Sequence, residues 1–367
     1  MTAREQGIGR RQFITRSAGA MTAGVVVAGA VAHSGLASAL SVAPSAPLAD
    51  PLLAVAPQLR EGARTVITMG RAMSPLTMPK LAPMRETASK MAAPLLPDVP
   101  VAERRIPVSA TIPDVTVYVI NAKSGGAPRP AILHTHGGGM VMGSARAERR
   151  YLQEFARDLD CVIVSVEYTL APEARYTRSV AENYAALRWL HRSAADLGVD
   201  PRRLAVMGES AGGGHAALLA IRARDGGEVP LVAQILVYPM LDDRTGSTRL
   251  PPAPIGTLGW DAQANRFGWQ ALLGAEPGSR SVPIAGVPAR VPSVAGLPPA
   301  FIGVGSIDLF VQEDIAYARR LTEAGIATEL LVVPGAYHAF DRVVPEAELS
   351  RMFAGAMRAA LRRAFTA

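Results

Sequence analysis

The stretch Gly208-Glu209-Ser210-Ala211-Gly212 decides the fold prediction for this chain. It follows the short run 203–207, which has strand character, and precedes the small, helix-prone run 213–220. A Gly-x-Ser-x-Gly pentapeptide between a strand and a helix is typical of a tight elbow at the end of a parallel strand. The glycines leave room for the turn, and the following helix N-terminus favours negative charge. Ser210 is therefore a candidate nucleophile, although the pentapeptide alone is a weak signal.

Strand and helix patterns alternate on both sides of this elbow. The runs with strand patterning are 115–120, 131–135, 162–168, 204–207, 233–238, 300–304 and 328–333, with regular alternation beginning at Ile106. The runs with helical patterning are 148–157, 180–192, 211–224, 313–324 and 346–365. This order predicts an α/β fold in which helices cover both faces of a mostly parallel sheet.

Two segments depart from that rhythm. Residues 243–297 are rich in Pro and Gly and carry Trp260 and Trp269 around an expected helix. A segment of this length between two strands is typical of a functional insertion, so we expect it to form part of a cap. Residues 59–91 have helical spacing broken by prolines at 75, 79 and 83, which predicts short helices. Their methionines are expected to fill a core or, if they lie over Ser210, to form a pliable apolar lid.

A nucleophilic serine needs a base that takes its proton. His338 lies in the glycine-bearing loop 334–340, after the last expected strand, from which a side chain can reach the carboxyl edge of the sheet. The other histidines are His33 near the N-terminus, His134 in a strand, His136 in a glycine loop, and His191 and His215 on helices. We therefore predict His338 as the base.

The base in turn needs a carboxylate that orients it. Asp308 follows the strand 300–304 and precedes His338, which gives the chain order Ser, Asp, His expected for this architecture. The main competitors are Asp242 and Asp243, after the preceding strand, whereas Asp314 is expected on a helix surface. We predict Asp308 as the acid of the triad.

Backbone donors for a developing oxyanion are predicted in the run His136-Gly137-Gly138-Gly139, directly after a strand. Glycines allow N–H groups to point into a pocket without steric conflict. The N–H groups of Gly138, Gly139 and Ala211 are the expected donors, while His136 and Gly137 shape the turn. A phosphate-binding loop is the alternative, but the run has neither a Gly-Lys-Ser/Thr ending nor a Gly-x-Gly-x-x-Gly pattern.

These motifs, with the runs 167–173, 208–213, 297–299 and 334–340, resemble the bacterial hormone-sensitive-lipase-like esterases of the α/β-hydrolase fold. The resemblance covers about residues 100–367. It implies a serine carboxylesterase that hydrolyses small to medium acyl esters through an acyl-enzyme, without a metal or organic cofactor. Glu209 departs from the commoner Asp or Thr of the family, and we expect it to be a buried hydrogen-bonding group.

Two kinds of alternative remain. An amidase, lactonase or arylformamidase would use the same triad with a different pocket. A ligand-binding protein on the hydrolase scaffold would be expected to lack a triad member, whereas this chain retains all three candidates.

Composition narrows the class of protein further. The chain has 367 residues, 49% hydrophobic and 19% charged, which suits a soluble globular protein with a sizeable core. The net charge is +7, but no basic tract with interleaved aromatic residues indicates nucleic-acid binding. The lone cysteine, Cys161, lies in an apolar run and is expected to be a buried small hydrophobe. A small-molecule ester is the expected partner, and a homodimer is possible.

The N-terminus resembles a twin-arginine export signal over residues 1–39. Arg10-Arg11 precede the small, uncharged, apolar run 17–32, and Ala37-Ser38-Ala39 fits a cleavage site. We expect a periplasmic, cell-envelope or extracellular protein without stable membrane insertion of the mature chain. The expected organisation continues with a linker and N-terminal cap helices over 40–100. A catalytic domain follows over 101–367, with the cap insertion at about 243–297.

Overall fold

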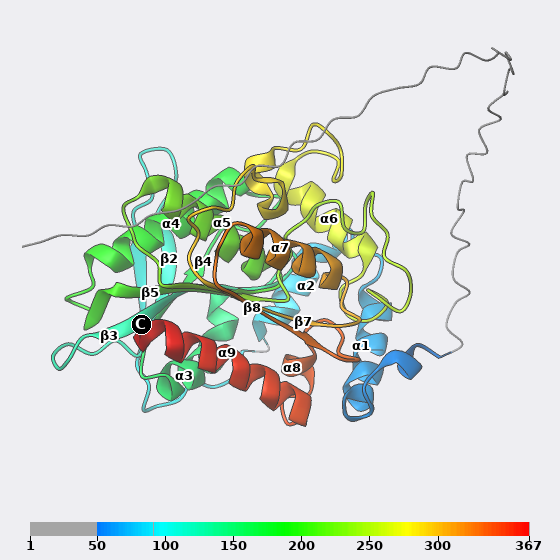
Figure 1. The fold of residues 1–367 in the computed structure, drawn as a ribbon, viewed down its shortest axis with the longest axis horizontal. Coiled ribbons are helices and arrows are strands. Elements are labelled where there is room, and N and C mark those ends of the chain that lie inside the picture. The colour runs from blue at the N-terminus through cyan, green and yellow to red at the C-terminus, as the bar shows by residue number, and fades with distance from the viewer. Residues whose placement is uncertain (1–49, 91, 367) are drawn as a thin grey trace, which may run out of the picture. The chain divides into compact units, whose positions relative to one another are not determined.

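Figure 1 shows the computed structural model, which describes residues 50–90 and 92–366. The expected export signal (1–39) and residues 40–49 of the expected linker lie outside the described residues. The strands are β1 (Val101–Ile106), β2 (Val115–Ile120), β3 (Arg129–Thr135), β4 (Val162–Glu167), β5 (Val199–Glu209), β6 (Ala233–Val237), β7 (Ala300–Gly305) and β8 (Thr328–Val333). The α-helices are α1 (Arg60–Met73), α2 (Met78–Lys90), α3 (Ala145–Asp158), α4 (Tyr176–Arg192), α5 (Ala211–Gly226), α6 (Ala262–Leu273), α7 (Val311–Glu323), α8 (Phe340–Val343) and α9 (Glu348–Thr366). Short 3-10 helices are η1 (Pro51–Ala54), η2 (Pro57–Leu59), η3 (Ile284–Gly286) and η4 (Pro288–Arg290).

The strands form one sheet in the order β1-β2-β4-β3-β5-β6-β7-β8. Strand β2 runs antiparallel to β1 and β4, and the other neighbouring strands are parallel. In the register of β3 and β5, Thr135 lies opposite Gly208. The end of β5, which leads into Ser210, therefore lies beside the end of β3, which leads into the glycine loop.

Helices cover both faces of the sheet, as predicted (Figure 1). One face packs against α4, α5 and α7, with Leu187 and Leu219 among the buried residues. The opposite face packs against α3 and α9, through Phe155 and Phe353. Each of these helices buries an apolar stripe against the sheet. The alternation in the sequence thus translates into a sheet between two helical layers.

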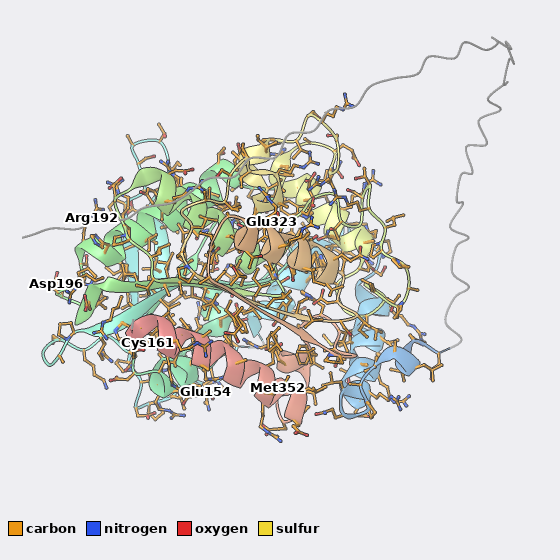
Figure 2. The ribbon with its side chains drawn as sticks, viewed as in Figure 1. Glu154, Cys161, Arg192, Asp196, Glu323 and Met352 are labelled. Atoms are coloured by element: carbon orange, nitrogen blue, oxygen red, sulfur yellow. The ribbon has the colours of Figure 1, made fainter. Side chains whose placement is uncertain are left out.

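Figure 2 shows how the α3–α9 layer divides between core and solvent. Glu154 on α3 and Met352 on α9 point outward and are about two-fifths exposed, at 42% and 44%. Cys161, the residue before β4, is fully buried and packs in the core between this layer and the sheet. Burial raises the pKa of its thiol to about 12, so the thiolate is disfavoured and the cysteine is chemically quiet.

Helix α2 differs from the sequence prediction, because it continues through Pro79 and Pro83 instead of breaking there. Pro79 lies in the first turn, where its missing N–H has no intrahelical acceptor to lose. Arg85 then ties the helix to the body of the protein. It donates to the carbonyls of Val141 at 2.7 Å and Ala171 at 2.8 Å. These tertiary contacts explain why the helix persists despite an internal proline.

Strand β1 begins at Val101, five residues before the expected alternation at Ile106. Its middle residues are exposed because it is the edge strand, so they carry no apolar pattern for sequence reasoning to detect. Within the described residues, no helix is both long enough and apolar enough to cross a membrane.

Candidate active site

Ser210 lies on a strained turn between β5 and α5. Its backbone has φ 55° and ψ −121°, in a region that costs a residue other than glycine roughly 1–3 kcal/mol. Two backbone hydrogen bonds hold this conformation. The Ser210 N–H donates to Val237 O at 2.8 Å, and the Met240 N–H donates to Ser210 O at 2.9 Å. The end of β6 and the turn after it therefore fix the serine in place.

The turn also needs a glycine at position 212. A Cβ on Gly212 would lie 2.0 Å from the carbonyl oxygen of Thr135, at the end of β3. The Thr135 hydroxyl donates to Gly212 O at 2.7 Å, so the two backbones meet closely. This close approach sets the distance between the serine and the glycine loop that follows β3.

The structure brings together three predicted residues that are far apart in the chain. His338 Nε2 lies 3.0 Å from Ser210 Oγ, and His338 Nδ1 lies 2.8 Å from Asp308 Oδ2. The serine hydroxyl donates to Nε2, and Nδ1–H donates to the carboxylate, which defines the imidazole tautomer. This geometry is that of a base hydrogen-bonded to a nucleophile on one side and to an orienting acid on the other.

Neighbouring groups restrict the motion of the imidazole and the carboxylate. Asp308 is fully buried, and its Oδ1 accepts the Phe310 N–H at 3.0 Å. The Phe310 and Tyr238 rings meet the His338 ring edge-on, with centroids 5.3 and 4.9 Å away. The imidazole is thus held by packing as well as by hydrogen bonds.

The loop after β3 is folded so that its amides are available. Gly138 has φ 122°, and its carbonyl accepts the N–H groups of Val141 and Met142 at 3.2 and 2.8 Å. Within the described part of the chain, no acceptor takes the N–H of Gly138, Gly139 or Ala211. These three amides are the donors expected from the sequence.

His136 and Tyr168 support this loop from beneath. Their rings stack with centroids 4.2 Å apart, and the Tyr168 hydroxyl donates to His136 O at 2.8 Å. Burial lowers the pKa of His136 to about 4, so the ring is neutral and its Nδ1–H donates to Gly137 O at 2.9 Å. His215 meets the other side of Tyr168, and burial lowers its pKa to about 3. Both histidines are neutral packing groups.

The competing carboxylates are engaged with arginines. Asp242 pairs with Arg244 at 2.7 Å, and Asp243 pairs with Arg290 at 2.6 Å. The expectation that Asp314 lies on a helix surface is wrong, because this residue is fully buried. Burial, together with the nearby Glu313 and Asp308, raises the pKa of Asp314 well above its ordinary value.

Glu209 has the buried hydrogen-bonding role expected for it. Its Oε2 lies 2.9 Å from His134 Nε2, and His134 Nδ1 lies 2.8 Å from Ser165 Oγ. Burial alone would raise the pKa of Glu209, but the interactions with His134 and the Arg342 charge lower it overall. This carboxylate is therefore ionised, and its hydrogen bond goes to His134 and not to Ser210 or His338.

A cavity of about 800 Å³ opens over Ser210. Much of its lining is apolar, with Val66 and Met69 from α1, Met142, Leu258 and Trp260 among the residues. Met69 thus lies where the sequence allowed a pliable lid over the serine. The N-terminal helices and the segment between β6 and β7 contribute to the same cavity.

One charged wall of this cavity was missed by sequence reasoning. Arg342 on α8 and Glu148 on α3 both line it, and they form an ion pair at 2.7 Å. The two residues are far apart in the chain, and neither belongs to a motif. The only signal in the sequence was that Arg342 follows the predicted base by four positions.

The sheet order, the strained serine and its hydrogen-bonded histidine define a serine hydrolase of the α/β-hydrolase fold. The family model described as alpha/beta hydrolase fold matches residues 132–342. The carboxylesterase NlhH of Mycobacterium tuberculosis is 36% identical over 280 residues, which cover 74% of this chain and 85% of that protein.

Two solved esterase structures also resemble this chain. The structure of a bacterial heroin esterase superposes on this chain with a TM-score of 0.78 and is 31% identical in sequence. The match covers 86% of this chain and 99% of the heroin esterase chain. The structure of esterase LipW from Mycobacterium marinum superposes with a TM-score of 0.67 at 32% identity. That match covers 86% of this chain and 98% of the LipW chain. The chain belongs to the α/β-hydrolase family, within its hormone-sensitive-lipase-like esterases, and is a serine ester hydrolase.

Proposed function

We propose that this protein is a carboxylesterase in which Ser210, His338 and Asp308 form the catalytic triad. The observation that carries the proposal is the continuous hydrogen-bonded chain from Ser210 through His338 to Asp308, with links of 3.0 and 2.8 Å. Ser210 and His338 both line the cavity. The carboxylesterase relative and the esterase structures support ester hydrolysis as the reaction.

In the first step, Ser210 Oγ attacks the ester carbonyl carbon while His338 Nε2 takes the hydroxyl proton. The imidazole becomes positively charged, and the buried Asp308 carboxylate stabilises that charge through Nδ1–H. The carbonyl oxygen becomes an oxyanion, for which Gly138, Gly139 and Ala211 supply N–H donors. One such donor typically contributes ~2.7–4 kcal/mol of transition-state stabilisation.

The tetrahedral intermediate then collapses. The bond between the carbonyl carbon and the alcohol oxygen breaks, and His338 gives its proton to the leaving alkoxide. An acyl group remains on Ser210 Oγ. Water attacks that acyl group with His338 as base, and the acid is released as the serine recovers its proton.

The direct test is a chain-length panel of activated esters with matched amides, run alongside a serine-directed phosphonate probe. We expect ester turnover, phosphonate labelling at Ser210, and a loss of ~10⁴–10⁶ in kcat for Ser210→Ala. Ser109→Ala, the same change at a loop serine outside the cavity, is the control. Full hydrolysis by the Ser210 variant, or labelling at another serine, would refute the assignment.

The same panel separates two of the alternatives, an amidase and a ligand-binding protein. Faster turnover of the matched amides would favour an amidase with this triad. Binding of acyl compounds without turnover would favour a ligand-binding protein. Neither is favoured by the relatives, which are esterases.

We also propose that residues 1–39 direct export by the twin-arginine route, on the strength of Arg10-Arg11 and the apolar run after them. Fusing this segment to a reporter that is active only after export would test the proposal. Replacing both arginines by lysine should abolish the signal. A homodimer remains a prediction, which sedimentation analysis of the purified protein can decide.

A further inference from the structure

Arg342 and its partner Glu148 form an ion pair in the lining of the cavity. Arg342 belongs to α8, the single helical turn that begins two residues after His338. Its Nη2 lies 2.7 Å from Glu148 Oε2, and its Cζ lies 3.8 Å from the centroid of the Tyr151 ring. The guanidinium is therefore fixed in orientation by α3 while it lines the space above Ser210.

Several N–H donors of the Arg342 guanidinium are not used in hydrogen bonds to described residues. An arginine carries five N–H groups in a planar fork. In the described part of the chain, a single hydrogen bond uses them, from Nη2 to Glu148, and no acceptor takes the N–H of Nε or Nη1. The Arg342 side chain is 32% exposed, and it borders the substrate cavity. An oxygen atom of a bound molecule can accept these unused donors.

The charges around Arg342 indicate which kind of oxygen atom in a bound molecule would accept these hydrogen bonds. Glu148 already offsets the Arg342 charge, and the ionised Glu209 adds a negative charge nearby. The cavity lining also contains Arg71 and Asp261, whose opposite charges leave that balance unchanged. Asp341 is a further acidic neighbour, although burial raises its pKa to about 6. A wall with this balance does not attract an anion. It favours an uncharged acceptor such as a ketone, ether or hydroxyl oxygen.

We propose that Arg342, oriented by Glu148 and Tyr151, is a specificity-determining residue that donates hydrogen bonds to an uncharged oxygen in the substrate. The preferred esters therefore carry a carbonyl, ether or hydroxyl group away from the scissile bond. This inference rests on the proposed esterase function. It adds the substrate class: oxygen-bearing esters, in preference to plain alkyl esters of equal size.

A purely structural role for Arg342 would be the attachment of α8 to α3. Arg358 on α9 makes contacts of the same kind with α3. It pairs with Asp158 at 3.4 Å and lies 4.8 Å from the Phe155 ring centroid, outside the cavity. Arg358→Met therefore removes a similar attachment without touching the cavity, which makes it a matched control.

The test uses two pairs of substrates that differ only in one oxygen. On the acyl side, a chain ending in a methyl ketone is compared with the same chain ending in an isopropyl group. On the alcohol side, a methoxyethyl ester is compared with the butyl ester of the same acid. For each pair the ratio of kcat/KM, polar over apolar, is measured in the wild-type protein, Arg342→Met, the double variant Arg342→Met/Glu148→Gln, and Arg358→Met.

We expect the ratio in one pair to fall about tenfold in both Arg342 variants, the effect of a hydrogen bond from a charged donor, and to stay unchanged in Arg358→Met. The pair that responds identifies whether the acyl or the alcohol half meets Arg342. Because the ratio is internal to each protein sample, partial loss of folding does not alter it. The double variant removes the risk that an unpaired Glu148 charge causes the change.

Ratios that are the same in the wild-type protein and the Arg342 variants would overturn the proposal. An equal fall in Arg358→Met would also overturn it, since that would indicate general loosening of α3. Wild-type protein that hydrolyses none of the esters would instead refute the esterase function, which separates the two failures.

Discussion

The Asp308 carboxylate links the His338 imidazole to the backbone of the loop that contains Asp308. Its Oδ2 lies 2.8 Å from His338 Nδ1, while its Oδ1 accepts the Phe310 N–H at 3.0 Å. Asp308→Asn keeps the shape but offers an amide, which favours the wrong imidazole tautomer. We expect kcat to fall by about 10⁴, the effect of the equivalent change in other serine hydrolases.

Steady-state kinetics with an activated ester measures this fall, and circular dichroism checks that the variant is folded. Asp225→Asn, at an exposed position near the end of α5, is the control and should retain full activity. Near-normal turnover by Asp308→Asn would mean that another carboxylate orients the base.

Gly212 should tolerate no side chain. In Gly212→Ala the new Cβ would lie 2.0 Å from Thr135 O, a backbone atom that cannot move without shifting β3. We expect a loss of several kcal/mol or a displaced elbow, because overpacking costs about 1–3 kcal/mol even where side chains can adjust. Thermal unfolding and kcat measure the two effects.

Gly355→Ala is the matched control for that substitution. Gly355 lies on α9, where a new Cβ would meet no atom of another described element within 4 Å. An alanine there should stabilise the helix by about 0.5–1 kcal/mol. Equal melting temperatures for the Gly212 and Gly355 variants would contradict the close approach of β3 and the elbow.

Glu209 should matter for stability more than for chemistry. Glu209→Ala leaves the buried His134 Nε2 without its partner at 2.9 Å, which should cost about 1–3 kcal/mol in unfolding free energy. Glu209→Gln keeps a hydrogen-bonding group and should lose less. Urea unfolding measures the stability, and kcat/KM should fall far less than in Ser210→Ala. A loss of activity matching that of the serine variant would assign Glu209 a catalytic part.

Asp341 should make the stability depend on pH. Burial raises its pKa in the folded protein from 3.8 to about 6, so the folded state favours the neutral acid. The contribution of Asp341 to the free energy of unfolding is most favourable below pH 3.8, where the group is neutral in both the folded and the unfolded state. That contribution is lost as the pH rises through 6, where the folded protein must bury the ionised carboxylate. Asn at this position stays neutral and escapes that loss.

The stability advantage of Asp341→Asn over the wild-type protein should therefore grow by about 2 kcal/mol between about pH 4.5 and about pH 7.5. Denaturant unfolding at the two pH values measures it. A constant difference between the proteins would show that Asp341 ionises normally in the folded state.

Much of this architecture could be predicted from local sequence, because its signals are local. The strand before Ser210, the glycines beside it and the helix after it fall within some twenty residues, where side-chain periodicity and turn chemistry act directly. The His338 loop and the strand before Asp308 are similar short-range patterns. Their order along the chain was enough to predict which side chains the sheet would bring together.

The errors have a different origin. Strand β1 was missed because its exposed edge carries no apolar alternation. Helix α2 passes through Pro83 because its own residue Arg85 is hydrogen-bonded to carbonyls outside the helix. Asp314 was expected on the surface because a charged residue in a helix usually lies there. Its burial results from how α7 packs beside the Asp308 loop.

The sequence by itself determined the layered fold, and it was enough to propose the nucleophile, the base, the acid and the amide donors, because each depends on residue type and short spacing. Only the tertiary structure decided the character of the cavity. Glu148 and Arg342 are far apart in the chain and meet at 2.7 Å because α3 and α8 pack together beside the serine. Such a contact depends on the positions of whole elements, which no local pattern encodes.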